Sequence, residues 1–297
     1  MTIEPWYWIP FTVTAAAAQV GRNATQRSLT AAIGTVAATQ VRFFYGLPFG
    51  LAFAALAVFW HGQGLPSMNT SSLAWTATGG IAQIIATGLM LAAMREKSFV
   101  VAIALTKIEP VWVAVFGLLV LGDRLSEQVL IAIAIATLGV LALSLPSRGL
   151  AWNAKPVIYG LASGAMFAVA AIGFRAAILA LGTEHFVLAA SVTLGLGLAI
   201  QSGLLLLFMM WRDRQGLVAM MEAWRPSLLA GALGALASQA WFLAFAVESA
   251  ARVRTLALIE ILFAQALSRR LFSQQTTRAE WLGMALLVGG VILVLSP

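Results

Sequence analysis

The sequence predicts an all-α integral membrane protein with ten transmembrane helices, arranged as two inverted five-helix repeats. Composition is the first reason, because 61% of the 297 residues are hydrophobic and 10% are charged, against about 25% charged residues in ordinary globular domains. Long apolar runs and a constant internal repeat are the second and third. A soluble enzyme of this length would expose the surplus apolar residues as aggregating surface, which excludes that class.

A membrane-spanning helix needs roughly 20 mostly apolar residues. Ten runs satisfy this requirement: 6–28, 36–60, 73–94, 99–121, 128–145, 157–179, 186–211, 227–247, 253–271 and 280–295. The connections are short, so consecutive helices are expected to be antiparallel neighbours. No connection has room for a soluble domain, which predicts one membrane domain in all.

The internal repeat has an offset of 151 residues without a gap, which pairs Trp60 with Trp211 and Glu109 with Glu260. We therefore predict an N-terminal five-helix repeat over residues 1–150 and a C-terminal five-helix repeat over residues 151–297. Because five is odd, the two repeats must enter the membrane in opposite orientations. Repeats of this kind are typical of transporters, with the substrate site at the repeat interface near the middle of the bilayer.

Charged residues near the middle of a span are the strongest functional candidates. Glu109 and Glu260 are equivalent under the repeat, and an ionisable group at this depth costs about 2.5 to 3.5 kcal/mol on insertion scales. Such groups normally face a cavity or a partner, so we favour a cavity role over a purely structural ion pair such as Lys107 with Glu260. Pro110 removes a backbone donor and is expected to kink the helix there, although proline is also common in ordinary membrane helices.

The first span carries an unusual set of polar residues. Gln19, Arg22, Asn23 and Gln26 share one broad face, which favours a helix that lines a cavity over a membrane helix that ends early. Arg42, near the start of the second span, is expected to reach the membrane interface with its long side chain.

Two amides and one indole complete the candidate cavity. Gln83 and Gln239 lie within apolar spans, where their amides need hydrogen-bond partners. Trp241 would form an aromatic wall of the cavity or, equally, face lipid.

Several chemistries are not supported by the sequence. The net charge of +7 comes from basic residues that lie mostly between apolar runs, as topology signals do, so we assign no nucleic-acid role. Cysteine is absent and the two histidines, His61 and His185, are expected to be solvated in connections, so neither a metal site nor a cofactor is predicted. No phosphate-binding loop is present, which disfavours direct use of ATP.

At these residues the chain resembles the EamA branch of the drug/metabolite transporter superfamily. The resemblance is carried by Gly21-x-Asn23, by Arg42-Phe43, and by Pro110 followed by the Leu-Gly-Asp-Arg-Leu-Ser turn at residues 121–126. It implies a ten-helix exporter, and within the family it is similar to the YddG-like amino-acid and metabolite exporters. The second half departs from the pattern, since Glu260 is followed by isoleucine and residues 273–277 lack the acidic turn.

These observations predict a secondary transporter that exports small metabolites, most of all amino acids, by alternating access around a central cavity. A zwitterionic substrate would place its ammonium at Glu109 or Glu260 and its carboxylate at Lys107 or Arg22. Proton coupling and uniport both stay open. The alternatives are a cationic drug or polyamine exporter and a membrane-embedded enzyme acting on lipid-linked substrates.

The predicted location is a bacterial inner membrane, with both termini on the same side and the monomer as the expected state. Most Lys and Arg residues fall in the odd-numbered connections, which by the positive-inside rule places the termini outside. The family resemblance implies termini in the cytoplasm, so both orientations stay open.

Overall fold

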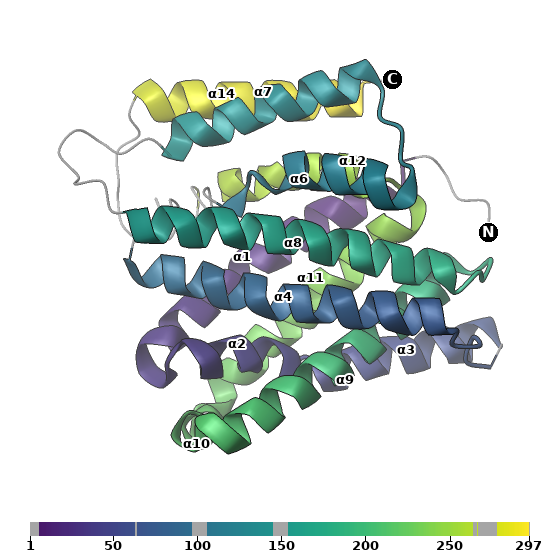
Figure 1. Cartoon of the computed structure of the whole chain (residues 1–297), viewed down its shortest axis with the longest axis vertical. Helices are drawn as coiled ribbons and strands as arrows, with labels where there is room; N and C mark the ends of the chain where they lie inside the picture. The colour runs from purple at the N-terminus through teal and green to yellow at the C-terminus, as the bar shows by residue number, and fades with distance from the viewer. Residues whose placement is uncertain are drawn as a thin grey trace.

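The computed structural model describes residues 6–62, 64–96, 106–144, 154–263, 266 and 278–296. These residues form α-helices with short π and 3-10 segments, and the long helices lie roughly along one direction (Figure 1). The predicted boundary between residues 150 and 151 lies outside the described residues, as do parts of the spans predicted at 99–121 and 253–271.

The first half contains α1 (Trp8–Ile33), α2 (Thr35–Phe44), α3 (Leu47–His61), α4 (Thr70–Glu96), α6 (Glu109–Phe116), the π-helical η1 (Gly117–Leu121) and α7 (Glu127–Ser144). The second half contains α8 (Ala154–Ala180), α9 (Phe186–Arg212), α10 (Arg214–Glu222), α11 (Trp224–Val247), α12 (Ala250–Leu256), the 3-10 segment η2 (Ala257–Ile259) and α14 (Arg278–Leu295).

Two elements differ from the sequence prediction. The second span is not one regular helix, because α2 ends before Tyr45 and α3 begins at Leu47 with Pro48 in its first turn. Proline is tolerated there since the first helical residues have no intrahelical acceptor for an N–H. The connection after α9 forms the short helix α10, whose first turn is capped by the Asp213 carboxylate accepting from the Gly216 N–H at 3.0 Å.

Helix α1 does not end early, because it continues to Ile33 and its polar residues Gln19, Arg22, Asn23 and Gln26 are all buried. It ends where Gly34 has a φ of 84°, a conformation that residues with a side chain rarely adopt.

The chain is an all-helical, multi-pass membrane protein. Within the described residues, five helical segments are long and apolar enough to cross a membrane: Thr35–His61, Thr70–Arg95, Lys155–Ala180, Phe186–Arg212 and Trp224–Val247. Shorter apolar helices cover Glu109–Leu121, Glu127–Ala142 and Trp281–Leu295. The arrangement of ten spans in inverted repeats stays a prediction.

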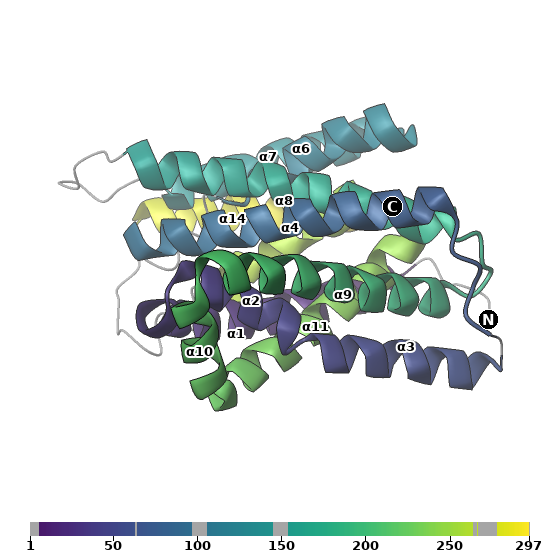
Figure 2. The same ribbon diagram turned by 60° about the horizontal axis from the view of Figure 1, so that its bottom comes forward.

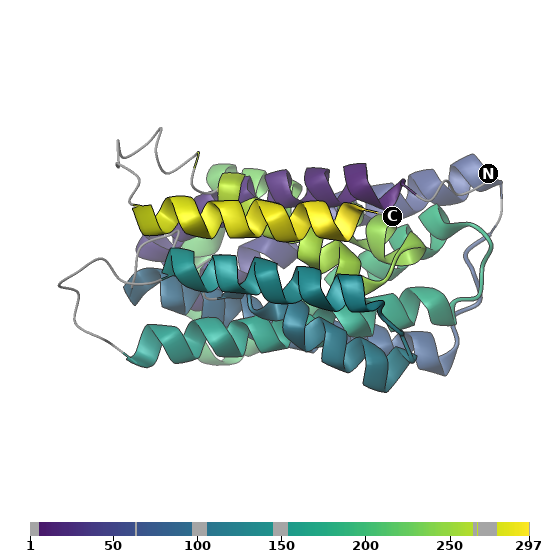
Figure 3. The same cartoon turned by 90° about the horizontal axis from the view of Figure 1, so that it is seen from above.

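Packing pairs a helix of one half with a helix of the other. Helix α4 lies along α8, α1 packs against α11, and α7 packs against α14 (Figures 1 to 3). Similarly, α3 packs against α9, and α6 against α12. The interior is therefore largely an interface between the two halves.

The start of α1 and the end of α14 lie at one end of the bundle, which we call the terminal end (Figure 1). Arg252 shows this directly, because its guanidinium lies 5.2 Å from the Trp8 ring at the start of α1 and donates to the Val294 carbonyl near the end of α14.

Candidate functional site

Two ion pairs join the halves in the buried interior. Lys107 Nζ lies 2.5 Å from Glu260 Oε2, and Arg254 Nε lies 2.9 Å from Glu109 Oε1. The second contact is an ion pair without hydrogen-bond geometry, since both of its atoms lack a hydrogen-bond partner. All four side chains are buried. Each half thus contributes one carboxylate, and each carboxylate is neutralised by a cation of the other half.

Both carboxylates follow an irregular segment of helix. Lys107 and Ile108 form a turn before α6 begins at Glu109, with Pro110 in the first helical turn. The 3-10 segment η2 ends at Ile259, directly before Glu260. The structure therefore places Pro110 at a break in the helix, where the backbone lets the Lys107 and Glu109 side chains reach separate partners.

Glu260 receives three hydrogen bonds from the first half. Besides Lys107, Gln19 Nε2 donates to Oε2 at 2.6 Å and Asn23 Nδ2 donates to Oε1 at 3.1 Å. A buried carboxylate with several donors is far less costly than an isolated one. The predicted candidates Gln19, Asn23, Lys107 and Glu260 are thus in direct contact.

Trp241 is part of this cluster and does not face lipid. Its side chain is buried, and Nε1 donates to Gln19 Oε1 at 3.0 Å. The Arg254 guanidinium lies 4.4 Å from the Trp241 ring and 5.1 Å from the Phe245 ring. A desolvated guanidinium over an aromatic face gains about 2 kcal/mol.

Arg22 and Arg42 lie beside the ion pairs without a carboxylate partner of their own. Arg22 donates to Asn23 Oδ1 from Nε at 3.2 Å and from Nη2 at 2.5 Å. Arg42 donates to Thr87 Oγ1 at 3.0 Å and to Ser238 Oγ at 3.4 Å. The expectation that Arg42 reaches the membrane interface is therefore wrong, because its side chain is bound between α4 and α11 and is 1% exposed.

The two amides Gln83 and Gln239 bond towards α9 and make no hydrogen bond with the carboxylates. Gln201 Nε2 donates to Gln83 Oε1 at 2.8 Å, and Gln239 Nε2 donates to Ser191 Oγ at 2.8 Å. Each amide thus has a partner that holds α4 or α11 against α9, although the buried Gln239 Oε1 accepts no hydrogen bond.

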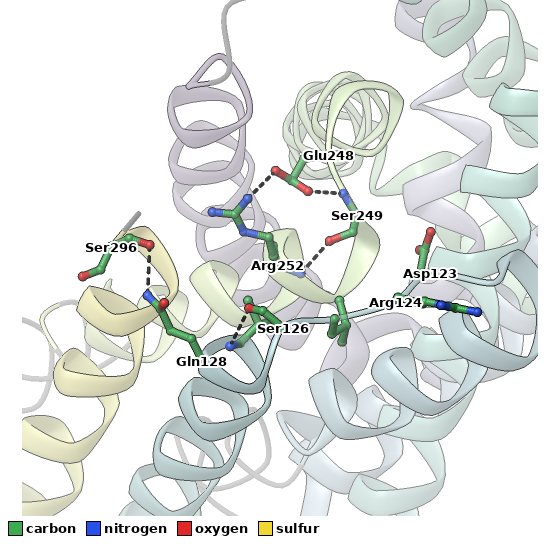
Figure 4. Close-up of a pocket in the computed structure, with 10 residues that line it drawn as sticks. Asp123, Arg124, Ser126, Gln128, Glu248, Ser249, Arg252 and Ser296 are labelled. Atoms are coloured by element: carbon green, nitrogen blue, oxygen red, sulfur yellow. Dashed lines mark hydrogen bonds and ion pairs between the residues drawn. The ribbon is translucent and has the colours of Figure 1, made fainter.

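A polar cavity of about 450 Å³ opens at the terminal end (Figure 4). Both halves line it, with Asp123, Ser126 and Gln128 on one side and Glu248 and Arg252 on the other. Glu248 binds Arg252 at 2.9 Å, and Gln128 donates to carbonyls near the end of α14.

Arg175 of α8 ties the halves together near this cavity. Its guanidinium lies 3.6 Å from Asp123 of the first half and donates to the Phe245 and Glu248 carbonyls. Sequence reasoning did not select Arg175, Arg42 or Arg254 as site residues. The available signal was the presence of arginines inside or at the ends of apolar spans.

The two histidines lie next to each other. The His61 and His185 rings lie 4.4 Å apart, where the end of α3 meets the start of α9. No group of three or more metal-ligating side chains occurs among the described residues.

Apolar helices of spanning length around a buried charge cluster are typical of membrane proteins rather than of soluble proteins. Residues 6–145 match the model of the EamA-like transporter family. This segment is about half of the chain, and it is similar to a family of transporters of small molecules. The matched family is a family of transporters and not of enzymes, which disfavours the membrane-embedded enzyme.

One solved structure, titled "Crystal structure of protein", is similar to the whole chain in fold. It has a TM-score of 0.67 and 15% sequence identity, and the alignment covers 96% of this chain and 94% of the other. At this identity the similarity concerns the fold alone. No curated protein matches the chain.

Proposed function

We propose that this protein is a secondary transporter that exports small metabolites, with amino acids as the first candidates, by alternating access between its two halves. The observation that carries the proposal is the crosswise pairing of Lys107 with Glu260 and of Glu109 with Arg254. Contacts of this kind lock two rigid bodies together, and they must be rearranged when the bodies move against each other.

The pattern of helix packing supports an inverted repeat. Adding the 151-residue offset to the bounds of α7 gives the bounds of α14, and adding it to the segment 35–61 gives the bounds of α9. The offset relates α1 to α8 and α4 to α11, so the contact between α1 and α11 becomes the contact between α8 and α4. The contact between α7 and α14 and the contact between α3 and α9 each become themselves. This is the contact pattern expected of two units related by a two-fold axis.

Helix direction supports the inversion as well. Helix α1 begins at the terminal end, where Trp8 meets Arg252. Its counterpart α8 ends there, because Arg175, in its last turns, bonds to the Glu248 carbonyl. Equivalent helices therefore run in opposite directions, which a rotation axis in the membrane plane produces.

The rival cationic exporter is disfavoured by the same pairs. A polyamine would need unpaired carboxylates, yet Glu109 and Glu260 each have a cation from the opposite half. If the two glutamates did bind a cationic drug, Lys107→Met would spare or improve transport. We expect it instead to abolish transport, since Glu260 loses its charged partner.

The test is uptake of labelled amino acids into liposomes that contain the purified protein. Wild type is compared with Glu109→Gln, Glu260→Gln and the matched control Glu222→Gln, which removes an exposed carboxylate of α10. We expect saturable uptake that is lost in the first two variants and retained in the control. Normal uptake in both buried variants would reduce the crosswise pairs to structural contacts, and no uptake by wild type would contradict amino acids as substrates.

A further inference from the structure

The buried charges of the described residues do not balance. Two carboxylates, Glu109 and Glu260, are each paired with one cation, Arg254 and Lys107 respectively. Two more buried cations, Arg22 and Arg42, form no ion pair with a carboxylate among the described residues.

Arg22 and Arg42 converge on the same point of α11. A β-carbon added to Gly234 would lie 3.2 Å from Arg42 Cγ and 3.3 Å from Arg22 Cδ, so both side chains pass over this glycine. They are 0% and 1% exposed. Two buried cationic side chains that cross at one glycine repel each other and have lost most of their hydration.

Each of the two guanidinium groups also has an unused donor. Arg22 Nη1 and Arg42 Nε are buried and have no hydrogen-bond partner. The donors that are used reach only neutral oxygens, those of Asn23, Thr87 and Ser238. An anion placed between them would supply the missing acceptors and the missing charge at once.

We propose that Arg22 and Arg42 form the binding point for the anionic group of the substrate, and that the substrate is a small organic acid of net negative charge. The inference rests on the proposed function and narrows its substrate class. Guanidinium groups bind carboxylate and phosphoryl oxygens through paired hydrogen bonds, which suits either kind of acid. Among amino acids the site therefore favours acidic ones such as glutamate, because Glu109 and Glu260 are each already paired with a cation.

The site also connects the substrate to the contact between the halves. Asn23 accepts from Arg22 and donates to Glu260, which binds Lys107. An anion that takes the donors of Arg22 competes with Asn23 Oδ1 and frees that side chain. Substrate binding thereby affects the ion pair between Lys107 and Glu260 through Asn23.

Binding to the purified protein tests the proposal independently of transport. The probes are succinate and glutamate as carboxylates, glycerol 3-phosphate as a phosphoryl anion, leucine as a zwitterion and spermidine as a cation. Each is titrated into detergent-solubilised wild type, Arg22→Gln, Arg42→Gln and Arg42→Lys, with thermal stability and calorimetry as readouts. The matched control is Arg212→Gln, which removes an exposed arginine at the end of α9.

We expect at least one anion to bind and stabilise wild type. Its affinity should be at least tenfold weaker for Arg22→Gln and Arg42→Gln, intermediate for Arg42→Lys, and unchanged for Arg212→Gln. Tighter binding of the carboxylates or of the phosphoryl anion identifies which acid is preferred. If leucine or spermidine binds and no anion does, or if the anions bind equally to the glutamine variants, the proposal is overturned. If the glutamine variants do not fold, the affinities of wild type and of Arg42→Lys for the five probes decide whether the site prefers an anion.

Liposome uptake then separates this inference from the proposed function. If an anion binds in a way that depends on the two arginines but no probe is taken up, the anion site is supported and the transport function is contradicted. Uptake of leucine that succinate and glycerol 3-phosphate do not inhibit would support transport and overturn the anion site.

Discussion

Lys107 and Glu260 come from opposite halves of the chain and lie 2.5 Å apart in the buried interior. Glu260 also binds Gln19 and Asn23 of α1, so a single carboxylate connects three residues of the first half to the second. Removing one member of such a pair leaves an uncompensated buried charge, which is a much larger penalty than the net contribution of the intact pair.

Lys107→Met should therefore destabilise the protein by about 3 to 5 kcal/mol, because it leaves Glu260 ionised without its cation. The double variant Lys107→Met with Glu260→Gln should recover part of this loss. A double-mutant cycle on the melting temperature in detergent measures the coupling. Losses that simply add would mean that the two side chains do not interact.

Glu260→Gln should destabilise the protein more than Glu109→Gln does. A glutamine at position 260 turns one acceptor oxygen into a donor, and this donor would face either Gln19 and Lys107 or Asn23. Glu109, by contrast, forms one ion pair among the described residues, with Arg254, and this contact lacks hydrogen-bond geometry. The melting temperatures of the two variants, with exposed Glu222→Gln as the reference, give the order. The reverse order would show that the hydrogen bonds to Glu260 contribute little.

The sequence predicted the long apolar helices well and the partners of the buried charges only in part. Helix α9 matches the expected span closely, because an apolar run is bounded by His185 and Arg212. Arg254 was missed, since the 151-residue offset aligns it with the apolar Ile103 and the repeat therefore provides no charged counterpart. Its partner Glu109 is distant in the sequence, so only tertiary packing brings the two together.

The same reasoning explains the misplaced Arg42. Its position near the start of a span resembles that of an interfacial arginine, but the residues that bind it, Thr87 and Ser238, lie on α4 and α11. Polarity along one helix cannot indicate which other helices provide partners. The break between α2 and α3 was missed for a related reason, because the apolar run continues through it.

Gly234→Ala should disturb the arginine pair while leaving the fold largely intact. The new methyl group would lie 3.2 to 3.3 Å from the side-chain stems of Arg22 and Arg42, which are flexible enough to shift by a few tenths of an ångström. We expect transport or anion binding to fall severalfold with a change in stability of about 1 kcal/mol. The matched control is Gly203→Ala, because nothing lies within 4 Å of that site. Equal effects of the two variants would contradict a role for the crossing at Gly234.

Trp241→Phe separates the indole hydrogen bond from the aromatic face. Phenylalanine keeps a ring beside Arg254 but removes the donor to Gln19 Oε1, which leaves that buried acceptor unsatisfied at a cost of about 1 to 3 kcal/mol. Trp241→Leu should cost more, because the cation–π contact is lost too. Chemical denaturation of both variants gives the difference, and equal losses would indicate that Arg254 gains nothing from the ring.

Asp123 and Arg175 tie the halves at the terminal end, and weakening this contact should favour opening there. Asp123→Asn removes the charge, while Arg175 keeps its two carbonyl acceptors, so we expect little loss of stability. Because the natural chain has no cysteine, Val129→Cys introduces a unique thiol at a buried position lining the terminal cavity. Thiol labelling should be several times faster when Asp123→Asn is added. An unchanged labelling rate would show that this ion pair does not hold the terminal end closed, and the crosswise pairs around Glu109 and Glu260 would then carry the closure alone.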